Sequence, residues 1–260
     1  MKRKLILFIF ILSSISLNAQ NLDLFKKKIH HNTWGDSLLY RMLEPLVSYT
    51  SCSDSTKKYP LVLFLHGAGE RGNDNEKQLI HGAKIFADQA NLINFPCFVI
   101  APQCPENYRW AETDWTLSSH TLPEEISFPE KLTMELIEEI IKNYPIDTNR
   151  IYITGLSMGG FGVWDLISRF PQKFAAAIPI CGGADLNYAP TVKDIPIWAF
   201  HGAKDKLVKV SRTRNMIYLI KKEGGKPKYT EFPSLGHFCW NAAYSTKNLL
   251  QWMFSQSKIK

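Results

Sequence analysis

The strongest constraint on the fold is a series of short, unbroken apolar runs along the chain. Such runs are typical of strands that are buried on both faces, as in a parallel sheet. They occupy residues 61–65, 98–101, 151–154, 175–180 and 197–200, with a weaker one at 229–232, and residues 40–43 are expected to form an earlier strand. We therefore predict a sheet of about seven strands.

Helical patterns separate these runs. Ser127, Pro129 and Glu130 form a capping-box signal before apolar residues of helical period at 132–144, and further helices are predicted at 161–170, 213–223 and 245–254. The alternation predicts an α/β fold with a mostly parallel, doubly wound sheet and helices on both faces. In such sheets the functional site lies at the carboxyl ends of the strands.

The first residues have the pattern of an export signal. Residues 1–19 read MKRKLILFIFILSSISLNA, with a basic start, an apolar run and small residues before Gln20. This order is typical of a secretory signal peptide, and the apolar run is too short to span a bilayer. We expect cleavage after Ala19, a single catalytic domain over residues 20–260, and a secreted or periplasmic protein with no membrane contact after cleavage.

Charge and cysteine content limit the partners. Lys and Arg outnumber Asp and Glu by 31 to 24, a net charge of +7, and three of the positive residues lie at positions 2–4. No basic stretch of the kind that binds nucleic acid remains. The five cysteines lack zinc-site spacing, and their pairing stays open: Cys52, Cys97, Cys104, Cys181 and Cys239. The oligomeric state is equally open.

The sharpest motif is a serine flanked by glycines directly after a predicted strand. Residues 155–159 read GLSMG, which fits the G-x-S-x-G pattern of a nucleophile elbow, and a predicted helix follows. In an elbow, the serine sits on a tight strand-to-helix turn, and side chains at the glycine positions would collide with neighbouring backbone. We predict Ser157 as a nucleophile.

A serine nucleophile requires a base and an acid that orients the base. In hydrolases with this elbow, the acid and then the histidine follow the serine along the chain. Of the seven histidines, only His201 and His237 follow Ser157. Because Asp205 follows a predicted strand and His237 follows the last one, we predict Asp205 as the acid and His237 as the base. Asp185 and Asp194 are the alternatives for the acid.

An oxyanion that develops on the substrate needs hydrogen-bond donors. We predict the backbone N–H of Met158 as one donor and that of Ala68 as the other, with the neighbouring Gly67 as the alternative. Residues 67–72 also match G-x-G-x-x-G, a dinucleotide-binding pattern. That pattern requires an acid at the end of the next strand, where the sequence reads APQ, so the dinucleotide hypothesis is weak.

A long connection between residues 102 and 128 follows one of the predicted strands. Long ordered loops at strand ends often shape substrate pockets. Trp110 and Trp115 in this loop, and Trp240 after the predicted base, are candidates for substrate binding. Packing of these side chains into the core is the alternative.

Five segments together resemble a known group of enzymes. They read LVLFLHGAGERG (61–72), APQCP (101–105), ITGLSMGG (153–160), FHGAKDKLV (200–208) and SLGHFCW (234–240). They resemble the secreted α/β-hydrolase esterases, above all the phospholipase/carboxylesterase, dienelactone-hydrolase-like and polyhydroxybutyrate-depolymerase-like groups, with feruloyl and acetyl-xylan esterases as relatives. The resemblance covers about residues 38–255. It implies the triad Ser157, Asp205 and His237, an oxyanion loop at Gly67 and Ala68, and no cofactor. Residues 181–194 leave little room for a large lid between the last predicted strands.

From these observations we expect an exported serine esterase whose substrate is a small-molecule or polysaccharide ester. Esters on plant polysaccharides, feruloyl or acetyl, are the substrate hypothesis. Two alternatives stay open: a small secreted serine peptidase or amidase with the same triad, and a hydrolase fold that binds carbohydrate without catalysis. The sequence does not specify the acyl or the alcohol group.

Overall fold

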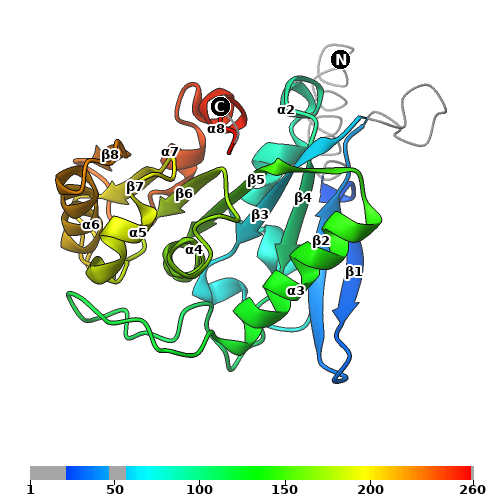
Figure 1. The fold of residues 1–260 in the computed structure, drawn as a ribbon, viewed down its shortest axis with the longest axis horizontal. Helices are drawn as coiled ribbons and strands as arrows, with labels where there is room; N and C mark the ends of the chain where they lie inside the picture. The colour runs from blue at the N-terminus through cyan, green and yellow to red at the C-terminus, as the bar shows by residue number, and fades with distance from the viewer. Residues whose placement is uncertain (1–21, 47–56, 259–260) are drawn as a thin grey trace, which may run out of the picture.

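The computed structural model describes residues 22–46 and 57–258. Its centre is an eight-stranded sheet with the strand order β1-β2-β4-β3-β5-β6-β7-β8 (Figure 1). β1 pairs with β2 and β2 with β4 in antiparallel fashion, and every other neighbouring pair is parallel. The strands are Lys26–His31, Ser37–Leu43, Tyr59–Leu65, Phe98–Pro102, Ile146–Leu156, Ala176–Ile180, Trp198–Gly202 and Lys228–Phe232.

Helices cover both faces of this sheet, as the alternating pattern predicted. The α-helices are α2 (Gln89–Asn94), α3 (Phe128–Asn143), α4 (Met158–Arg169), α5 (Ala189–Val192), α6 (Ser211–Lys222), α7 (Trp240–Tyr244) and α8 (Leu249–Phe254). Short 3-10 turns η1 (Ala68–Glu70), η2 (Lys77–Leu79), η3 (Ala83–Ala87) and η4 (Leu186–Tyr188) lie in the connections.

The two faces of the sheet bury two separate hydrophobic cores. Leu61, Leu63 and Leu65 of β3 pack on one face with apolar residues of α3, α4 and α6. Val62 and Phe64 point to the other face, where they pack with residues of η3, α2, α7 and α8. Strand β3 is fully buried, so both sets of alternating side chains must be apolar. This explains the unbroken run in the sequence.

The predicted capping box at the start of α3 forms only in part. Ser127 Oγ accepts a hydrogen bond from the amide of Glu130 at 3.3 Å, as predicted. The Glu130 side chain does not return the contact, because both of its buried carboxyl oxygens lack a hydrogen-bond partner among the described residues. Burial raises the pKa of Glu130 well above its usual value.

Two further expectations differ from the structure. The helix predicted at 245–254 is wrong in its bounds: α7 ends at Tyr244, and α8 begins only after Asn248, whose φ of 64° is left-handed. The edge strand β1 was not predicted, because KKKIHH is mostly polar and only one of its residues is buried. Residues 1–19, the predicted signal peptide, and Cys52 lie outside the described residues.

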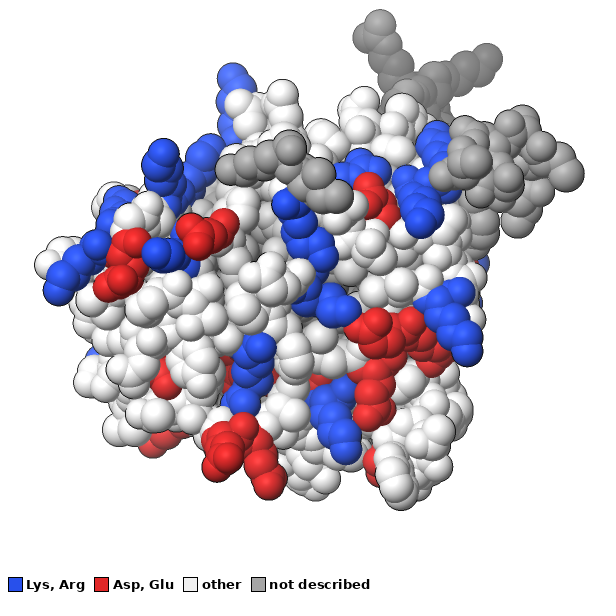
Figure 2. Space-filling model, viewed as in Figure 1, with Lys and Arg blue, Asp and Glu red and all other residues white. Residues whose placement is uncertain are grey.

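The visible surface carries mixed charge. On the face seen in Figure 2, Lys and Arg side chains are interspersed with Asp and Glu. No helix within residues 22–46 and 57–258 is long and apolar enough to cross a membrane.

Candidate active site

Ser157 lies on a strained turn between β5 and α4. Its φ is 55° and its ψ is −119°, a conformation that residues other than glycine rarely adopt. The Ser157 amide donates to the carbonyl of Ile180 at the end of the neighbouring strand, at 2.9 Å. Helix α4 begins at the next residue, Met158. The turn therefore has the geometry of a nucleophile elbow.

The two glycines of the motif are required by close backbone contacts. A Cβ atom on Gly155 would lie 2.6 Å from the carbonyl oxygen of Gly159. A Cβ atom on Gly159 would lie only 2.0 Å from the carbonyl oxygen of Leu65 and 2.7 Å from that of His66. Side-chain atoms do not approach backbone atoms this closely. The start of α4 can therefore pack against the end of β3 only if positions 155 and 159 are glycine.

The three residues predicted as a triad form one hydrogen-bonded chain. Ser157 Oγ lies 2.8 Å from Nε2 of His237, and Nδ1 of His237 lies 2.7 Å from Oδ2 of Asp205. All three follow the carboxyl ends of parallel strands: Ser157 follows β5, Asp205 follows β7 and His237 follows β8. The same edge of the sheet thus brings together residues that are 80 and 32 positions apart in sequence.

The surroundings of Asp205 keep it ionised. Its side chain is fully buried, and burial alone would raise its pKa. Hydrogen bonds from His201, from His237 and from the Val208 amide outweigh that effect and hold the pKa well below its usual value. An ionised carboxylate accepts the Nδ1 proton of His237, which leaves Nε2 as an acceptor for the Ser157 hydroxyl.

A second histidine also contacts the acid. His201 is fully buried on β7, and its Nε2 lies 3.1 Å from Asp205 Oδ2 and 3.0 Å from the Val208 carbonyl. Both partners are acceptors, so Nε2 carries a proton. Nδ1 lies 2.8 Å from the Thr213 hydroxyl of α6. The sequence offered His201 only as the rival base, whereas the structure makes it a hydrogen-bond donor behind Asp205.

The loop after β3 is held by His66. Burial lowers the pKa of His66 to about 4, so its ring is neutral near pH 7. Nδ1 lies 2.6 Å from the Gly67 carbonyl and donates to it, and Nε2 accepts from the Cys104 amide at 2.9 Å. Ala68 is the first residue of η1, as Met158 is of α4, so neither amide has an acceptor within its own helix.

The long loop after β4 packs against the site, and Arg212 anchors it. The Arg212 guanidinium is buried and donates to the carbonyls of Leu117 and Asp114 and to His120 Nδ1, at 2.7 to 2.8 Å. It also lies 5.1 Å from the ring centre of Phe161, in the first turn of α4. Because Arg212 belongs to α6, this single side chain joins two distant parts of the chain.

The three tryptophans predicted to bind substrate differ in exposure. Trp110 is fully buried, and its Nε1 donates to the His66 carbonyl at 3.0 Å, so it supports the loop from inside. Trp115 is half-buried under Arg109, whose guanidinium lies 4.7 Å from its ring centre. Trp240 is 6% exposed and lies edge-on to His237, with ring centres 5.9 Å apart.

The sequence analysis missed the most exposed aromatic ring beside the base. Phe238 is 74% exposed and lies 5.8 Å from the His237 ring and 5.0 Å from the Trp240 ring. Its position next to the predicted base was the only signal available. Phe238 and Trp240 together form an apolar surface beside the triad.

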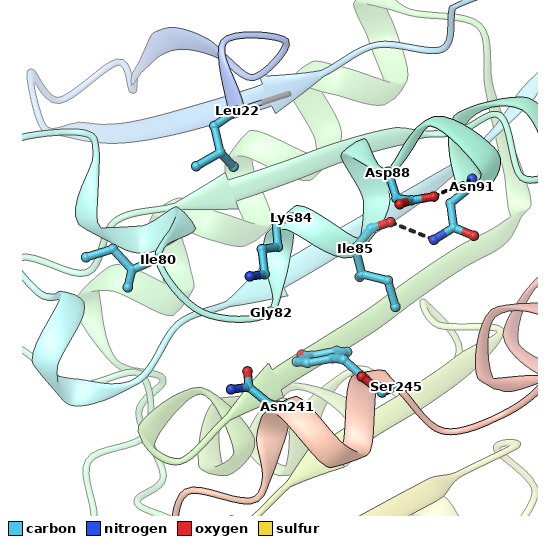
Figure 3. A pocket seen from close by; sticks show the side chains of 10 residues that line it. Leu22, Ile80, Gly82, Lys84, Ile85, Asp88, Asn91, Asn241 and Ser245 are labelled. Carbon is cyan, nitrogen blue, oxygen red and sulfur yellow. Dashed lines mark hydrogen bonds between the residues drawn. The ribbon is translucent and has the colours of Figure 1, made fainter. Parts of the chain in front are cut away.

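A cavity of about 620 Å³ lies beside α7 (Figure 3). It opens between the segment of η3 and α2 on one side and α7 on the other. Lys84, Asp88, Asn241 and Ser245 are among its lining residues, and Ser157, Asp205 and His237 are not. The triad therefore lies outside this cavity.

Comparison with known proteins identifies the family. The sequence pattern of the Phospholipase/Carboxylesterase family matches residues 50–246. The chain belongs to this family. Its fold is the α/β-hydrolase fold, as expected from the sequence. A solved thermostable esterase superposes with a TM-score of 0.83 at 39% identity, over 92% of this chain and 64% of that one. A ferulic acid esterase from Anaeromyces mucronatus superposes with a TM-score of 0.61 at 16% identity, over 87% and 89% of the two chains.

Curated relatives of this phospholipase/carboxylesterase family member are mostly longer. An uncharacterized secreted protein of Arthroderma benhamiae is 26% identical over 86% of this chain and 26% of its own length. A bifunctional acetylxylan esterase/xylanase of Neocallimastix patriciarum is 29% identical over 32% of this chain and 12% of its own. The chain thus spans about a quarter or less of these two proteins.

Proposed function

We propose that this chain is an exported serine esterase that hydrolyses carboxylic esters through Ser157, His237 and Asp205. The observation that carries the proposal is the continuous hydrogen-bonded chain from the Ser157 hydroxyl to the ionised Asp205 carboxylate. Membership of the phospholipase/carboxylesterase family supports the same reaction class. Export is supported by the N-terminal sequence and by the relative described as secreted.

In the proposed reaction, Ser157 Oγ attacks the ester carbonyl carbon while His237 Nε2 takes the hydroxyl proton. The resulting imidazolium is stabilised by Asp205 and then gives its proton to the leaving alcohol. The acyl group stays on Ser157 until water, activated by His237 in the same way, releases the acid. The Ala68 and Met158 amides are the proposed donors to the oxyanion, because each begins a helical turn and Gly159 of α4 lies against the Leu65 and His66 carbonyls, just before the loop that carries Ala68.

We further propose that the acyl group is aromatic, such as a feruloyl group on a plant polysaccharide. The exposed ring of Phe238 and the edge of Trp240 offer an apolar surface next to His237, where a planar acyl or alcohol group can pack. The acetylxylan esterase among the relatives supports polysaccharide esters as the wider class. A smaller acetyl group would leave Phe238 without a role.

A panel of substrates tests this function. The purified protein is assayed with p-nitrophenyl acetate, butyrate and octanoate, methyl ferulate, acetylated xylan and a peptide anilide. We expect ester turnover with the highest kcat/KM for methyl ferulate. Faster cleavage of the peptide anilide than of matched esters would indicate a peptidase or amidase instead. Failure to react with a fluorophosphonate, in a folded protein, would favour a binding role.

Substitution of His201 is expected to weaken catalysis without removing it. His201→Phe deletes the donor to Asp205 Oδ2, and a hydrogen bond to a charged group of this kind contributes enough to lower kcat/KM by roughly ten-fold. His201→Gln retains an amide donor on a side chain of similar reach and should recover part of the loss. Kinetics on p-nitrophenyl butyrate and a thermal unfolding curve for each variant check this. Equal kcat/KM for the wild type and both variants would contradict the role.

A further inference from the structure

The carboxylate of Glu70 is buried in the loop that carries Ala68, and the reaction described above does not use it. Glu70 is the last residue of η1 and is 9% exposed. Its Oε2 has no hydrogen-bond partner among the described residues. A Cβ atom on Gly67 would lie 2.9 Å from this oxygen and 3.0 Å from Cδ1 of Leu156, the residue before Ser157. The carboxylate and the Leu156 side chain therefore both pack against Gly67.

A carboxylate in this position is costly for stability. Burial raises the pKa of Glu70, and the charge of the nearby His81 opposes this effect. Replacement of a buried ion pair by apolar side chains of similar volume is often neutral or stabilising, so packing alone does not require a charge here. A role in the site explains the carboxylate better than a role in the core.

The ionic partner of Glu70 is His81, in the connection between η2 and η3. Glu70 Oε1 lies 3.8 Å from His81 Nε2, within the range of an ion pair. The next residue, Gly82, has a φ of 80°, and a Cβ atom on it would lie 2.4 Å from the Tyr244 ring and 2.9 Å from the Phe64 ring. The backbone beside His81 is therefore fixed between β3 and α7.

His81 in turn contacts the segment that carries the proposed base. Its ring centre lies 5.3 Å from that of Trp240, the first residue of α7. Trp240 lies edge-on to His237, with ring centres 5.9 Å apart. A continuous series of contacts thus leads from η1, through the Glu70–His81 pair and Trp240, to the base.

We propose that Glu70 and His81 are a positioning pair, which sets the loop that carries Ala68 relative to the segment that carries His237. The proposal rests on the proposed esterase function, since both segments belong to that site. Neither side chain acts on the reacting atoms: Glu70 holds η1 from within the loop, and His81 joins it to Trp240. A displacement of about 1 Å in a site of this kind can lower the rate by about 100-fold, so position alone can have a large effect on kcat.

A double-mutant cycle on kcat tests this role. Glu70→Ala and His81→Ala are each expected to lower kcat for p-nitrophenyl acetate by roughly ten-fold or more, with KM within about two-fold of the wild-type value. Independent effects on kcat would multiply, whereas two members of one pair should give a double variant about as slow as the slower single variant. Glu70→Gln keeps the size of the side chain and can still hydrogen-bond to His81, so it should recover part of the loss.

The matched control is Glu76→Ala, which removes an exposed acid between β3 and β4 whose ion-pair partner is Lys27, at 2.5 Å. Its kcat should equal that of the wild type. Thermal unfolding curves show which variants are folded at the assay temperature, and if Glu70→Ala is not, the cycle is run with Glu70→Gln. Unchanged kcat in the folded variants, losses that multiply in the double variant, or a raised KM at constant kcat would overturn the positioning role.

The wild-type protein separates this proposal from the proposed function. If it hydrolyses p-nitrophenyl acetate and the variants match it, the positioning pair alone is disproved. If it hydrolyses no ester of the panel, the same cycle is measured on the rate at which a fluorophosphonate labels Ser157, and the same pattern of losses is expected. A folded wild-type protein that neither hydrolyses esters nor reacts with the fluorophosphonate would overturn both proposals.

Discussion

Replacement of Ser157 by alanine is expected to lower kcat for ester hydrolysis by about 10⁴-fold or more. The reason is that His237 Nε2 lies 2.8 Å from Ser157 Oγ, and alanine has no hydroxyl to take the place of this nucleophile. KM should change little, since alanine removes the nucleophile and leaves Phe238, Trp240 and the Ala68 amide unaltered. Steady-state kinetics on p-nitrophenyl butyrate measure both parameters.

The control for this variant is its stability. Ser157 has a φ of 55°, so alanine at this position is as strained as serine, and the unfolding midpoint should not fall. Ser157→Gly relieves the strain, a release of about 1 kcal/mol that the added freedom of the unfolded chain partly offsets, and this variant should be inactive as well. A fluorophosphonate should add its mass to the wild-type tryptic peptide that carries Ser157 and should leave the tryptic peptide 174–193 unmodified. Near-normal turnover by folded Ser157→Ala would disprove the assignment.

The order of strands made the centre of the site predictable from sequence. Parallel strands bring their carboxyl ends to one edge of the sheet, so a serine, an acid and a histidine that each follow such a strand lie along the same edge. This reasoning used local apolar runs, the tight turn at Ser157 and the serine, acid, histidine order of hydrolases with such an elbow. It placed Ser157, Asp205 and His237 in the positions where the structure has them hydrogen-bonded.

Contacts made by one side chain across the fold were not predictable. Arg212 reaches from α6 to the loop around Leu117, 95 residues earlier, and nothing near Arg212 in the sequence indicates that contact. The direction of Trp110 is decided by the His66 carbonyl, which binds its indole N–H inside the molecule. The break between α7 and α8 depends on the backbone conformation of Asn248, which interrupts an otherwise continuous helical pattern.

Substitution of Gly159 by alanine is expected to destabilise the fold and to remove activity together. The added Cβ would lie 2.0 Å from the Leu65 carbonyl oxygen and 2.5 Å from its carbon, and these backbone atoms belong to the central strand β3. The start of α4 must therefore move away from β3, at a cost of about 3 kcal/mol or more. The same movement separates the Met158 amide from the loop that carries Ala68, so the remaining folded protein should also lose most of its kcat.

A neighbouring glycine provides the matched control. Gly69 lies in η1, and a Cβ atom there would have no atom within 4 Å. Gly69→Ala should leave the free energy of unfolding unchanged or raise it by about 0.5 kcal/mol, because alanine restricts the unfolded chain. Urea unfolding of both variants measures the difference. If Gly159→Ala were as stable as Gly69→Ala, the contact between α4 and the end of β3 could not be what fixes the Ser157 turn, and the proposed position of the oxyanion donors would fail with it.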